Sequence, residues 1–209
     1  MQEYIIQTPV ASIIFLFTVV TSVYAFYNQE VYGKLMLHPY SVSRGQRLFS
    51  LISSGLIHKD WIHLLVNMMS YYFFAFQLES TMASLSSWGH WQFGILYLLC
   101  MVLSDIPSVW KHKDHFWYNS LGASGAVSAV VFSYILFYPM TRMMILPIPI
   151  PIPAVLYGFL FLGYCWYASR HANDHINHDA HFYGAISGLI LTILYYPDIV
   201  PFFVGKLMS

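Results

Sequence analysis

The sequence predicts an all-α, polytopic membrane protein folded as a bundle of six transmembrane helices. Hydrophobic residues make up 58% of the 209 residues and charged residues only 9%, whereas a typical soluble domain carries about 25% charged residues. A surface exposed to water could not be made from so few charges. The second observation is a series of long apolar runs that contain almost no charge, which is typical of membrane-spanning helices.

Six apolar runs, separated by polar or proline-containing segments, account for the predicted helices. Each approaches the roughly 20 residues that a spanning helix needs. The first run contains no charged residue, and the third is expected to end shortly before Pro107. The third and fifth runs are the shortest, so their ends are the least sharply defined. Within a single domain over residues 1–209, the predicted spans are 9–26, 61–77, 88–103, 122–138, 154–168 and 180–196.

The segments between the runs carry most of the polar and turn-forming residues. The segment 27–60 is polar, and 111–115 is expected to be a charged loop. The first residues lack a basic region, so we expect no cleaved signal peptide and a retained first span. Proline cannot continue a helix, and alternate prolines favour a stiff, extended connector. These prolines are Pro147, Pro149, Pro151 and Pro153.

Charge and cysteine content exclude several classes of function. The nine basic and nine acidic residues cancel, so no nucleic-acid partner is expected, because such a partner requires a basic face. Cys100 and Cys165 both fall within apolar runs. They are predicted to be small buried residues rather than a disulfide or a metal-binding pair.

Polar residues inside the predicted spans gather at one end of the bundle. Successive spans alternate in direction, so the second, fourth and sixth begin on the same side of the membrane. His63 and Asn67 lie in the first two turns of the second span, Ser124 at the start of the fourth, and His181 in the first turn of the sixth. Ionisable and polar groups are costly in a bilayer, so their shared depth indicates a functional site.

These residue types fit nucleophilic catalysis. A serine hydroxyl needs an adjacent base, and histidine is suited to that role near neutral pH. At a helix start, the amides of Ser124 and Ala123 lack helical acceptors and could stabilise an oxyanion. Gly122 and Gly125 remove side chains where a substrate backbone must approach. His63 and Asn67, four residues apart on one helix face, could both donate to the same oxyanion.

Simpler interpretations compete with catalysis at each of these positions. Small residues such as those at 122–125 often mediate helix packing in membranes, and Asn67 could be an interhelical hydrogen-bonding residue. A single intramembrane histidine is also more often a hydrogen-bonding residue than a base. Asp179 lies two residues from His181 and so on another helix face. It is predicted to cap the sixth span rather than to complete a triad.

A metal site is the sharpest alternative to a serine–histidine pair. Four histidines recur at spacings that one helix face could hold, and zinc requires three or four ligands. However, the first two fall in a stretch rich in Asn and Asp, which favours a loop, and no His-Glu-x-x-His segment is present. We therefore expect no metal and no other cofactor. The histidines concerned are His171, His175, His178 and His181.

Three motifs, in order along the chain, resemble those of the rhomboid family of intramembrane serine proteases. Residues 122–125 (Gly-Ala-Ser-Gly) are similar to the family's G-x-S-G nucleophile motif. Residues 180–188 (Ala-His-Phe-Tyr-Gly-Ala-Ile-Ser-Gly) are similar to its A-H-x-x-G-x-x-x-G motif. His58, His63 and Asn67 fit its second-span pattern of two histidines followed by an asparagine. Together the motifs are specific, and the resemblance covers about residues 9–196.

The resemblance implies a serine endopeptidase, a hydrolase that cuts transmembrane-helix substrates through a Ser-His catalytic dyad. It implies that Ser124 is the nucleophile and that His181 acts as general base and acid. The expected surroundings are protein substrates and the lipid bilayer, with no obligate protein partner. The oxyanion is implied to be stabilised by His63, Asn67 and the amides of Ala123 and Ser124. Structural support is implied for Gly122, Gly125, Gly184, Gly188, Arg47, His58 and Glu79.

Two positions depart from the family's pattern. Ser128 stands where some members have a tyrosine that stacks on the catalytic histidine, and Gln46 stands where a tryptophan often precedes the bracing arginine. The stack on His181 is then expected from Tyr183 or Phe182, or is absent. Two further hypotheses remain open: a non-catalytic rhomboid-like adaptor that binds transmembrane helices, and a small transporter. Transporters tend to show internal repeats, and none is visible in this sequence.

The family's usual topology conflicts with the distribution of basic residues. That topology places both termini in the cytoplasm, with the active site of a multi-pass protein of a bacterial-type inner or plasma membrane opening to the extracytoplasmic side. Cytoplasmic segments would then hold only Arg142 and Lys206, and the positive-inside rule predicts the reverse. The outer loops would hold Lys34, Arg44, Arg47, Lys59, Lys111, Lys113 and Arg170.

Overall fold

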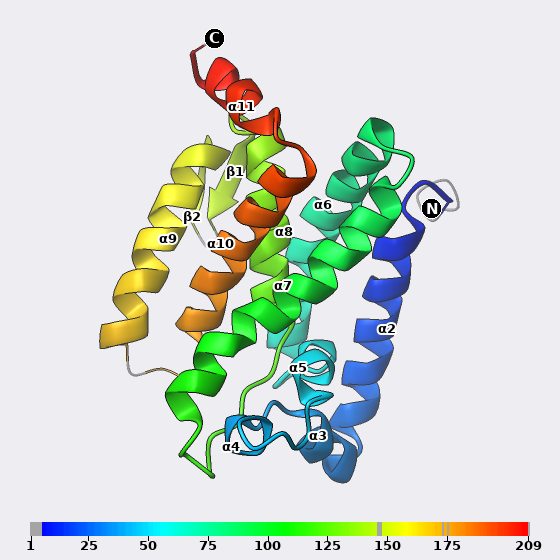
Figure 1. Ribbon diagram of the computed structural model, residues 1–209, viewed down its shortest axis with the longest axis vertical. Helices are drawn as coiled ribbons and strands as arrows, with labels where there is room; N and C mark the ends of the chain where they lie inside the picture. Colours follow the sequence, from blue (N-terminus) through cyan, green and yellow to red (C-terminus); the bar gives the residue numbers. More distant parts are fainter. Residues whose placement is uncertain (1–5, 146–147, 173, 175, 209) are drawn as a thin grey trace.

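The computed structural model describes residues 6–145, 148–172, 174 and 176–208. Six long helices run roughly alongside one another, and α8 occupies the middle of the bundle between α6, α7 and α10 (Figure 1). The outer helices are α2, which flanks α6 and α7, and α9, which lies beyond α10 at the opposite margin. Their bounds are α2 Pro9–Phe26, α6 Trp61–Leu85, α7 Gly89–His112, α8 Ser124–Phe137, α9 Ala154–His171 and α10 His178–Tyr195.

The central helix is buried on every side because it is surrounded by other helices. Every residue from Gly125 to Phe137 is buried, as expected of a helix that has no lipid-facing or water-facing side. In contrast, α2 exposes large side chains such as Leu16 and Phe17 along most of its length. The bundle therefore places its hydrophobic core around α8, with the outer helices as its cover.

The segment between α2 and α6 folds into short helices at one end of the bundle. Asn28 caps the first of them by accepting a hydrogen bond from the Val31 amide (3.1 Å). The Arg47 guanidinium donates to the carbonyls of Gly33, Lys34 and Met36 at 2.8–3.0 Å, which joins two parts of the segment. The elements are α3 Gln29–Leu35, α4 Pro39–Val42, α5 Ser50–Ser53 and the 3₁₀ helix η1 Ser54–Leu56.

The third run is longer than the sequence predicts. Instead of ending near 103, α7 passes through Pro107 and continues to His112, so the first two residues of the expected charged loop at 111–115 are helical. Proline within a helix removes one backbone hydrogen bond. The face of α7 that carries Ser104 and Ser108 is buried, and this packing outweighs that loss. In the same way α6 extends beyond 77 to Leu85.

The proline series is extended, as predicted, but it is also paired. Strand β1 Arg142–Ile145 runs antiparallel to β2 Ile148–Pro153, with Met143 opposite Ile152. Proline lacks an N–H, and successive residues of a strand direct their amides to opposite edges. The isoleucines of the alternating Ile-Pro sequence therefore all direct their amides to the same edge, where backbone carbonyls of β1 can accept the hydrogen bonds. The fold class is all-α as predicted, and this one small hairpin is an addition that the sequence did not indicate. Pro147 lies outside the described residues.

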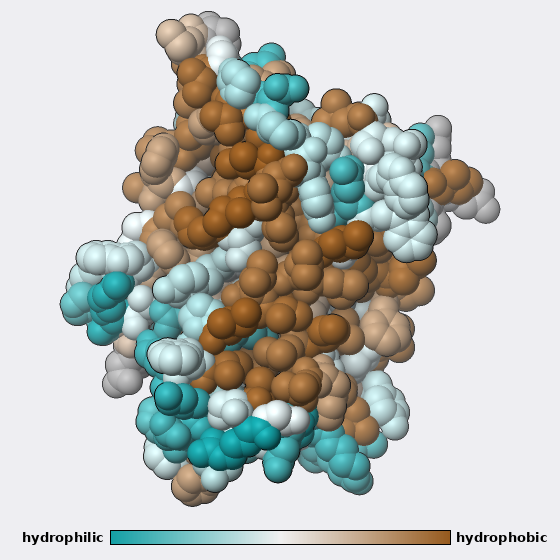
Figure 2. Space-filling view, in the orientation of Figure 1, coloured by the Kyte–Doolittle hydropathy of each residue, from teal (hydrophilic) through white to brown (hydrophobic). Residues whose placement is uncertain are grey.

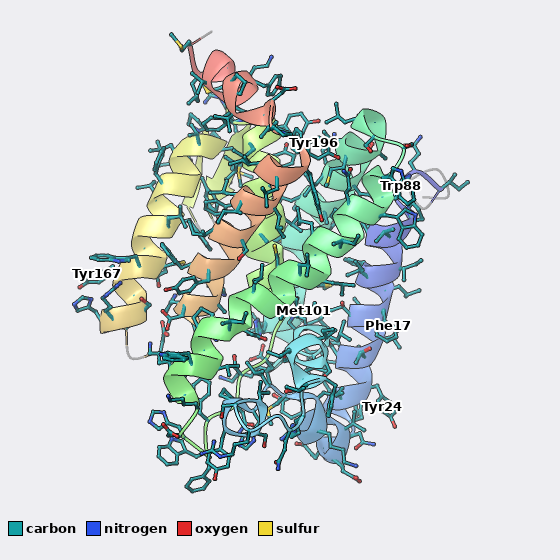
Figure 3. All side chains as sticks on the ribbon, viewed as in Figure 1. Phe17, Tyr24, Trp88, Met101, Tyr167 and Tyr196 are labelled. Carbon is teal, nitrogen blue, oxygen red and sulfur yellow. The ribbon has the colours of Figure 1, made fainter. Side chains whose placement is uncertain are left out.

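The surface is that of an integral membrane protein. By length and composition, α2 and α7 are the described helices able to cross a bilayer, with a third candidate if α10 and α11 Ile199–Met208, bent by 109°, form one broken span. A broad hydrophobic band covers the helices, and hydrophilic side chains gather at the end that holds α3 and α4 (Figure 2). Trp88 and Tyr196 lie near one end of this band and Tyr24 near the other (Figure 3), as is usual for interfacial aromatic residues.

Candidate active site at the start of α8

The start of α8 is shaped by a glycine whose backbone conformation would be strained for any other residue. Gly122 has a φ of +120°, and a Cβ placed on it would lie 2.7 Å from Cε1 and 3.0 Å from Nε2 of His63. Its amide donates to the carbonyl of Ser54 (2.9 Å). The chain then turns directly into α8, whose first residue is Ser124. No side chain caps this helix, so the Ser124 amide is one of the donors without a helical acceptor.

The neighbouring amide is engaged by a buried histidine. The Ala123 N–H donates to Nε2 of His58 (3.4 Å), and Nδ1 of the same ring lies 2.9 Å from the Ser22 hydroxyl. Since Nε2 accepts, the ring proton belongs on Nδ1, and the imidazole is neutral. Burial, together with the nearness of His63, lowers the pKa of His58 to about 3. His58 thereby ties the start of α8 to α2.

His63 and Asn67 lie on the same face of α6, as the spacing predicts. The backbone amide of Lys59 donates to Nδ1 of His63 (3.4 Å), which leaves the ring proton on Nε2, the nitrogen that adjoins Gly122. Asn67 is buried, and its side-chain amide donates to the His63 carbonyl (3.1 Å). Its second side-chain N–H has no partner within the described residues. His63 thus presents a neutral donor beside the start of α8, and Asn67 lies one turn further along the same face of α6.

Helix α10 meets α8 by direct backbone contact at two glycines. A Cβ on Gly184 would collide with the carbonyl of Gly125, and one on Gly188 with the backbone of Ala129. His181 lies one turn before Gly184 on this same face of α10. The contact therefore brings the first turn of α10, with His181, to the first turn of α8, with Ser124. Within the described part of the chain, no direct hydrogen bond joins the Ser124 hydroxyl to the His181 ring.

The aromatic neighbours of His181 differ from those expected. The rings beside it are Phe161 of α9, at 6.2 Å and 31° between planes, and His178, at 6.0 Å and 90°. Tyr183 is 43% exposed and pairs edge-on with Phe182. Because successive residues of a helix point about 100° apart, residues one and two positions after His181 cannot cover its ring. Among the described residues no ring stacks face to face on His181, and Phe161 comes tilted from a neighbouring helix.

A small polar cavity adjoins Ser124 and was missed from the sequence. Its volume is about 10 Å³, which approaches the space that one water molecule needs. The adjacent pair Ser104-Asp105, at the end of the third apolar run, was the available signal, but the residues reach the cavity only through the extension of α7. The polar side chains that line it are Ser54, Ser104, Asp105, Ser120, Ser124 and Asn177.

The start of α10 is capped by Asn177 rather than by Asp179. The Asn177 side chain accepts a hydrogen bond from the Ala180 amide (3.0 Å) and donates to Ser108 (2.8 Å). The prediction that Asp179 is the cap is wrong, because Asp179 lies within the first turn and pairs with Lys111 of α7 (2.7 Å). This ion pair directs the Asp179 carboxylate toward α7.

Two of the predicted supporting residues act far from this site. Glu79 lies 16 residues after His63 on α6, about 24 Å along the helix. Its buried carboxylate accepts the amides of Val10 (3.1 Å) and Ala11 (2.6 Å), at the start of α2, and also contacts Nδ1 of His90 (2.6 Å). Glu79 therefore stabilises the opposite end of the bundle, whereas Arg47 stabilises the segment between α2 and α6.

One group of side chains of the metal-binding type comes together in the described residues. The ligand atoms of Cys165, His178 and His181 lie within 4.8 Å of one another. Of the other two histidines considered from the sequence, His171 is exposed and bonded to the Tyr167 carbonyl (3.0 Å), and His175 lies outside the described residues.

Comparison with known families assigns the chain directly. The family model described as the Rhomboid domain matches residues 45–198, which is well over half of the chain. The chain therefore belongs to the rhomboid family. No curated protein matches the sequence. The matched region includes the starts of α6, α8 and α10, so the family assignment and the polar end of the bundle concern the same part of the molecule.

Proposed function

We propose that this protein is an intramembrane serine endopeptidase that cleaves transmembrane helices through a catalytic dyad of Ser124 and His181. The observation that carries the proposal is the glycine contact between α8 and α10, which brings the helix starts that hold these two residues together. The six long helices are proposed as six spans. At 14 residues, α8 is about 21 Å long, shorter than the roughly 30 Å hydrocarbon core, so Ser124 would lie below the membrane surface.

The proposed reaction follows the chemistry of a serine nucleophile. His181 takes the proton of the Ser124 hydroxyl while the oxygen attacks the scissile carbonyl, and it then gives that proton to the leaving amine. The resulting ester is hydrolysed by water, which adds a hydroxyl to the acyl carbon and returns a proton to Ser124. The small polar cavity beside Ser124 marks the path by which that water would arrive. Catalytic hydrogen bonds often tighten only when substrate binds.

The oxyanion would be stabilised by donors from two helices. The Ser124 amide and Nε2–H of His63 both adjoin the start of α8, and Asn67 has one uncommitted N–H. The Ala123 amide can join them only when its bond to His58 opens. Removing one such donor typically lowers the rate by about 10²–10³-fold.

Substrates would enter past α9. Most of the outer side of α9 is exposed, and the loop that follows it leads to His181. We propose that α9 and this loop act as gate and cap for a protein substrate that leaves the lipid phase. Helices that are easily unwound near the cut would be favoured, because the scissile backbone must leave its own helical hydrogen bonds to reach Ser124.

We also propose that the site opens to the extracytoplasmic side. The excess of basic residues there has a structural explanation, because several of them are fixed in local contacts. Arg44 donates to the carbonyls of Tyr40 and Lys113 (2.9 and 2.8 Å), and Arg47 and Lys111 are bonded as described above. Basic residues that are needed to build this end of the fold say little about membrane topology, because the positive-inside rule concerns short connecting loops.

Cleavage of a spanning substrate in reconstituted vesicles tests the proposal. Ser124→Ala and His181→Ala should each reduce cleavage by at least about 10³-fold without a change in melting temperature. Ser128→Ala, which alters a buried serine one turn later on α8, is the matched control and should stay active. Activity in the Ser124 variant equal to that of the unaltered protein would contradict the dyad.

The second candidate is a non-catalytic adaptor of the same fold that binds transmembrane helices. It is favoured by one observation, the lack of a direct Ser124–His181 hydrogen bond among the described residues. An adaptor would capture a spanning helix in vesicles without cleaving it, and Ser124→Ala would leave capture unchanged. Cleavage that depends on both dyad residues would exclude this candidate.

A further inference from the structure

We propose that Cys165, His178 and His181 form a binding site for a zinc-class metal ion between α9 and α10. The site lies where the proposed gate helix meets the helix of the proposed general base. The metal site stands on its own geometry, whereas its consequence for catalysis rests on the proposed protease function. A bound ion would occupy His181 and fasten α9 to α10.

The donor set and its spacing fit such an ion. One thiol and two imidazoles are ligands that zinc prefers, and three protein ligands with a fourth position left open are the pattern of catalytic zinc sites. The three ligand atoms already lie within 4.8 Å of one another. In a tetrahedral site with zinc–ligand bonds of about 2.0–2.3 Å, they would lie roughly 3.5 Å apart. Small rotations of three side chains about their χ angles close that gap.

His178 provides the independent sign of a ligand. The residue is only 4% exposed, and its Nδ1 is buried without a hydrogen-bond partner. Buried polar atoms normally have a partner, and an unmet one costs stability. Its other nitrogen, Nε2, lies 3.1 Å from Oδ2 of Asp174. A carboxylate on one ring nitrogen is the usual arrangement around a metal-binding histidine, because it orients the ring and leaves the other nitrogen free for the metal.

Cys165 has the right position for the third ligand. It is fully buried on the inner side of α9, together with Ala168 one turn later. The protein's other cysteine, Cys100, is equally buried but lies in α7, outside this group. Metal binding would convert the Cys165 thiol to a thiolate and release its proton to water. Cys100 is therefore a natural control for every effect of the Cys165 thiol.

Metal binding would inhibit the enzyme in two ways. A His181 nitrogen whose lone pair is bound to the metal cannot accept the Ser124 proton, so the base is lost. Linking α9 to α10 through one ion also holds the proposed gate closed against α10. The ion would thus be a reversible inhibitor that acts on the free enzyme, rather than a cofactor of hydrolysis.

Cobalt(II) reports the site without any need for activity, because a cobalt–thiolate bond gives a charge-transfer absorption band. We expect the band in the purified unaltered protein, in Cys100→Ala and in Ser124→Ala, and we expect it to be lost in Cys165→Ala. Should Cys165→Ala fail to fold, Cys165→Ser removes the thiolate with a smaller change in shape. A missing band in the unaltered protein, or an undiminished band in the folded Cys165 variant, overturns the proposal.

Zinc inhibition in vesicles then tests the consequence. The zinc concentration for half-inhibition of cleavage should be at least tenfold higher for Cys165→Ala than for the unaltered protein or Cys100→Ala. If zinc inhibits cleavage by the two cysteine variants at the same concentration, the proposed inhibitory role of the metal site is overturned. If the unaltered protein shows no cleavage at all, the protease proposal fails, and the cobalt measurement with Ser124→Ala still decides the metal site.

Discussion

Helices α8 and α9 both pack against α10, but they do so in different ways. Along α8 every residue after the first is buried, and glycines bring its backbone into contact with that of α10. Along α9 only Ala154, Gly158, Cys165 and Ala168 are buried, and its contact with the core runs through rings such as Phe161. Backbone contact fixes a distance, whereas side-chain contact can be remade. The difference separates the tight contact between the helices that carry Ser124 and His181 from a looser contact at α9, which lies at the margin of the bundle (Figure 1).

The largest effect is expected from a substitution that breaks the backbone contact between α8 and α10. In Gly188→Leu the new side chain would collide with the backbone of Ala129, and helix backbones cannot shift as side chains do. We expect unfolding free energy to fall by at least about 3 kcal/mol, the upper end of typical overpacking costs, or folding to fail. Thermal and denaturant unfolding in detergent micelles would measure it.

The matched control for this variant is Gly163→Leu on α9, where nothing lies within 4 Å of an added Cβ. It should melt within a few degrees of the unaltered protein. Similar melting of the two leucine variants would show that the α8–α10 contact is no tighter than the outer side of α9.

The next largest effect concerns the fixed start of α8. The lowered pKa of His58, about 3, means that the unfolded chain binds a proton between pH 6.5 and 3 while the folded protein does not. The stability that a neutral His58 contributes is therefore complete above pH 6.5 and is lost as pH falls, by up to about 1.4 kcal/mol per pH unit.

Melting temperatures between pH 7 and pH 4 would test this loss. His58→Gln keeps a donor and an acceptor but cannot titrate, so its melting temperature should fall less steeply on acidification. His171→Gln, at an exposed position of α9, should retain the steep fall. If the melting temperatures of the unaltered protein and of His58→Gln fall equally steeply with pH, protonation of His58 is not the cause of the lost stability.

The smallest effect is a difference in thiol reactivity. Cys165 on α9 and Cys100 on α7 are equally buried, so both react with an alkylating agent only when the structure opens locally. If α9 is the part that opens, single-cysteine variants should be alkylated several-fold faster at Cys165 than at Cys100, with a chelator present to keep metals away. Equal rates, or a faster reaction at Cys100, would remove the case for α9 as a gate.

Much of this arrangement could be predicted from the sequence because the bilayer imposes simple rules on apolar runs. The first span matches α2 residue for residue, and the runs at 122–138 and 180–196 differ from α8 and α10 by two residues at most. The alternating direction of successive spans was enough to predict that the second, fourth and sixth begin at the same end of the bundle. The rhomboid resemblance is confirmed by the family match.

What the sequence did not reveal depends on contacts between distant segments. The continuation of α7 past Pro107 is supported by tertiary packing, which outweighs a local helix-breaking preference. The capping role of Asn177 and the cavity behind Ser124 exist only once α7, α8 and α10 are assembled. The same holds for Phe161 beside His181, and for the meeting of Cys165 with two histidines, since no local pattern joins residues of different helices.

The reactivity of Ser124 tests the central claim most directly. A fluorophosphonate reacts only with a serine that a base has activated, so intact-protein mass should show one adduct, and peptide mapping should place it on Ser124. The adduct should be absent from Ser124→Ala and nearly absent from His181→Ala. An adduct at another serine, or undiminished labelling in the His181 variant, would contradict the account.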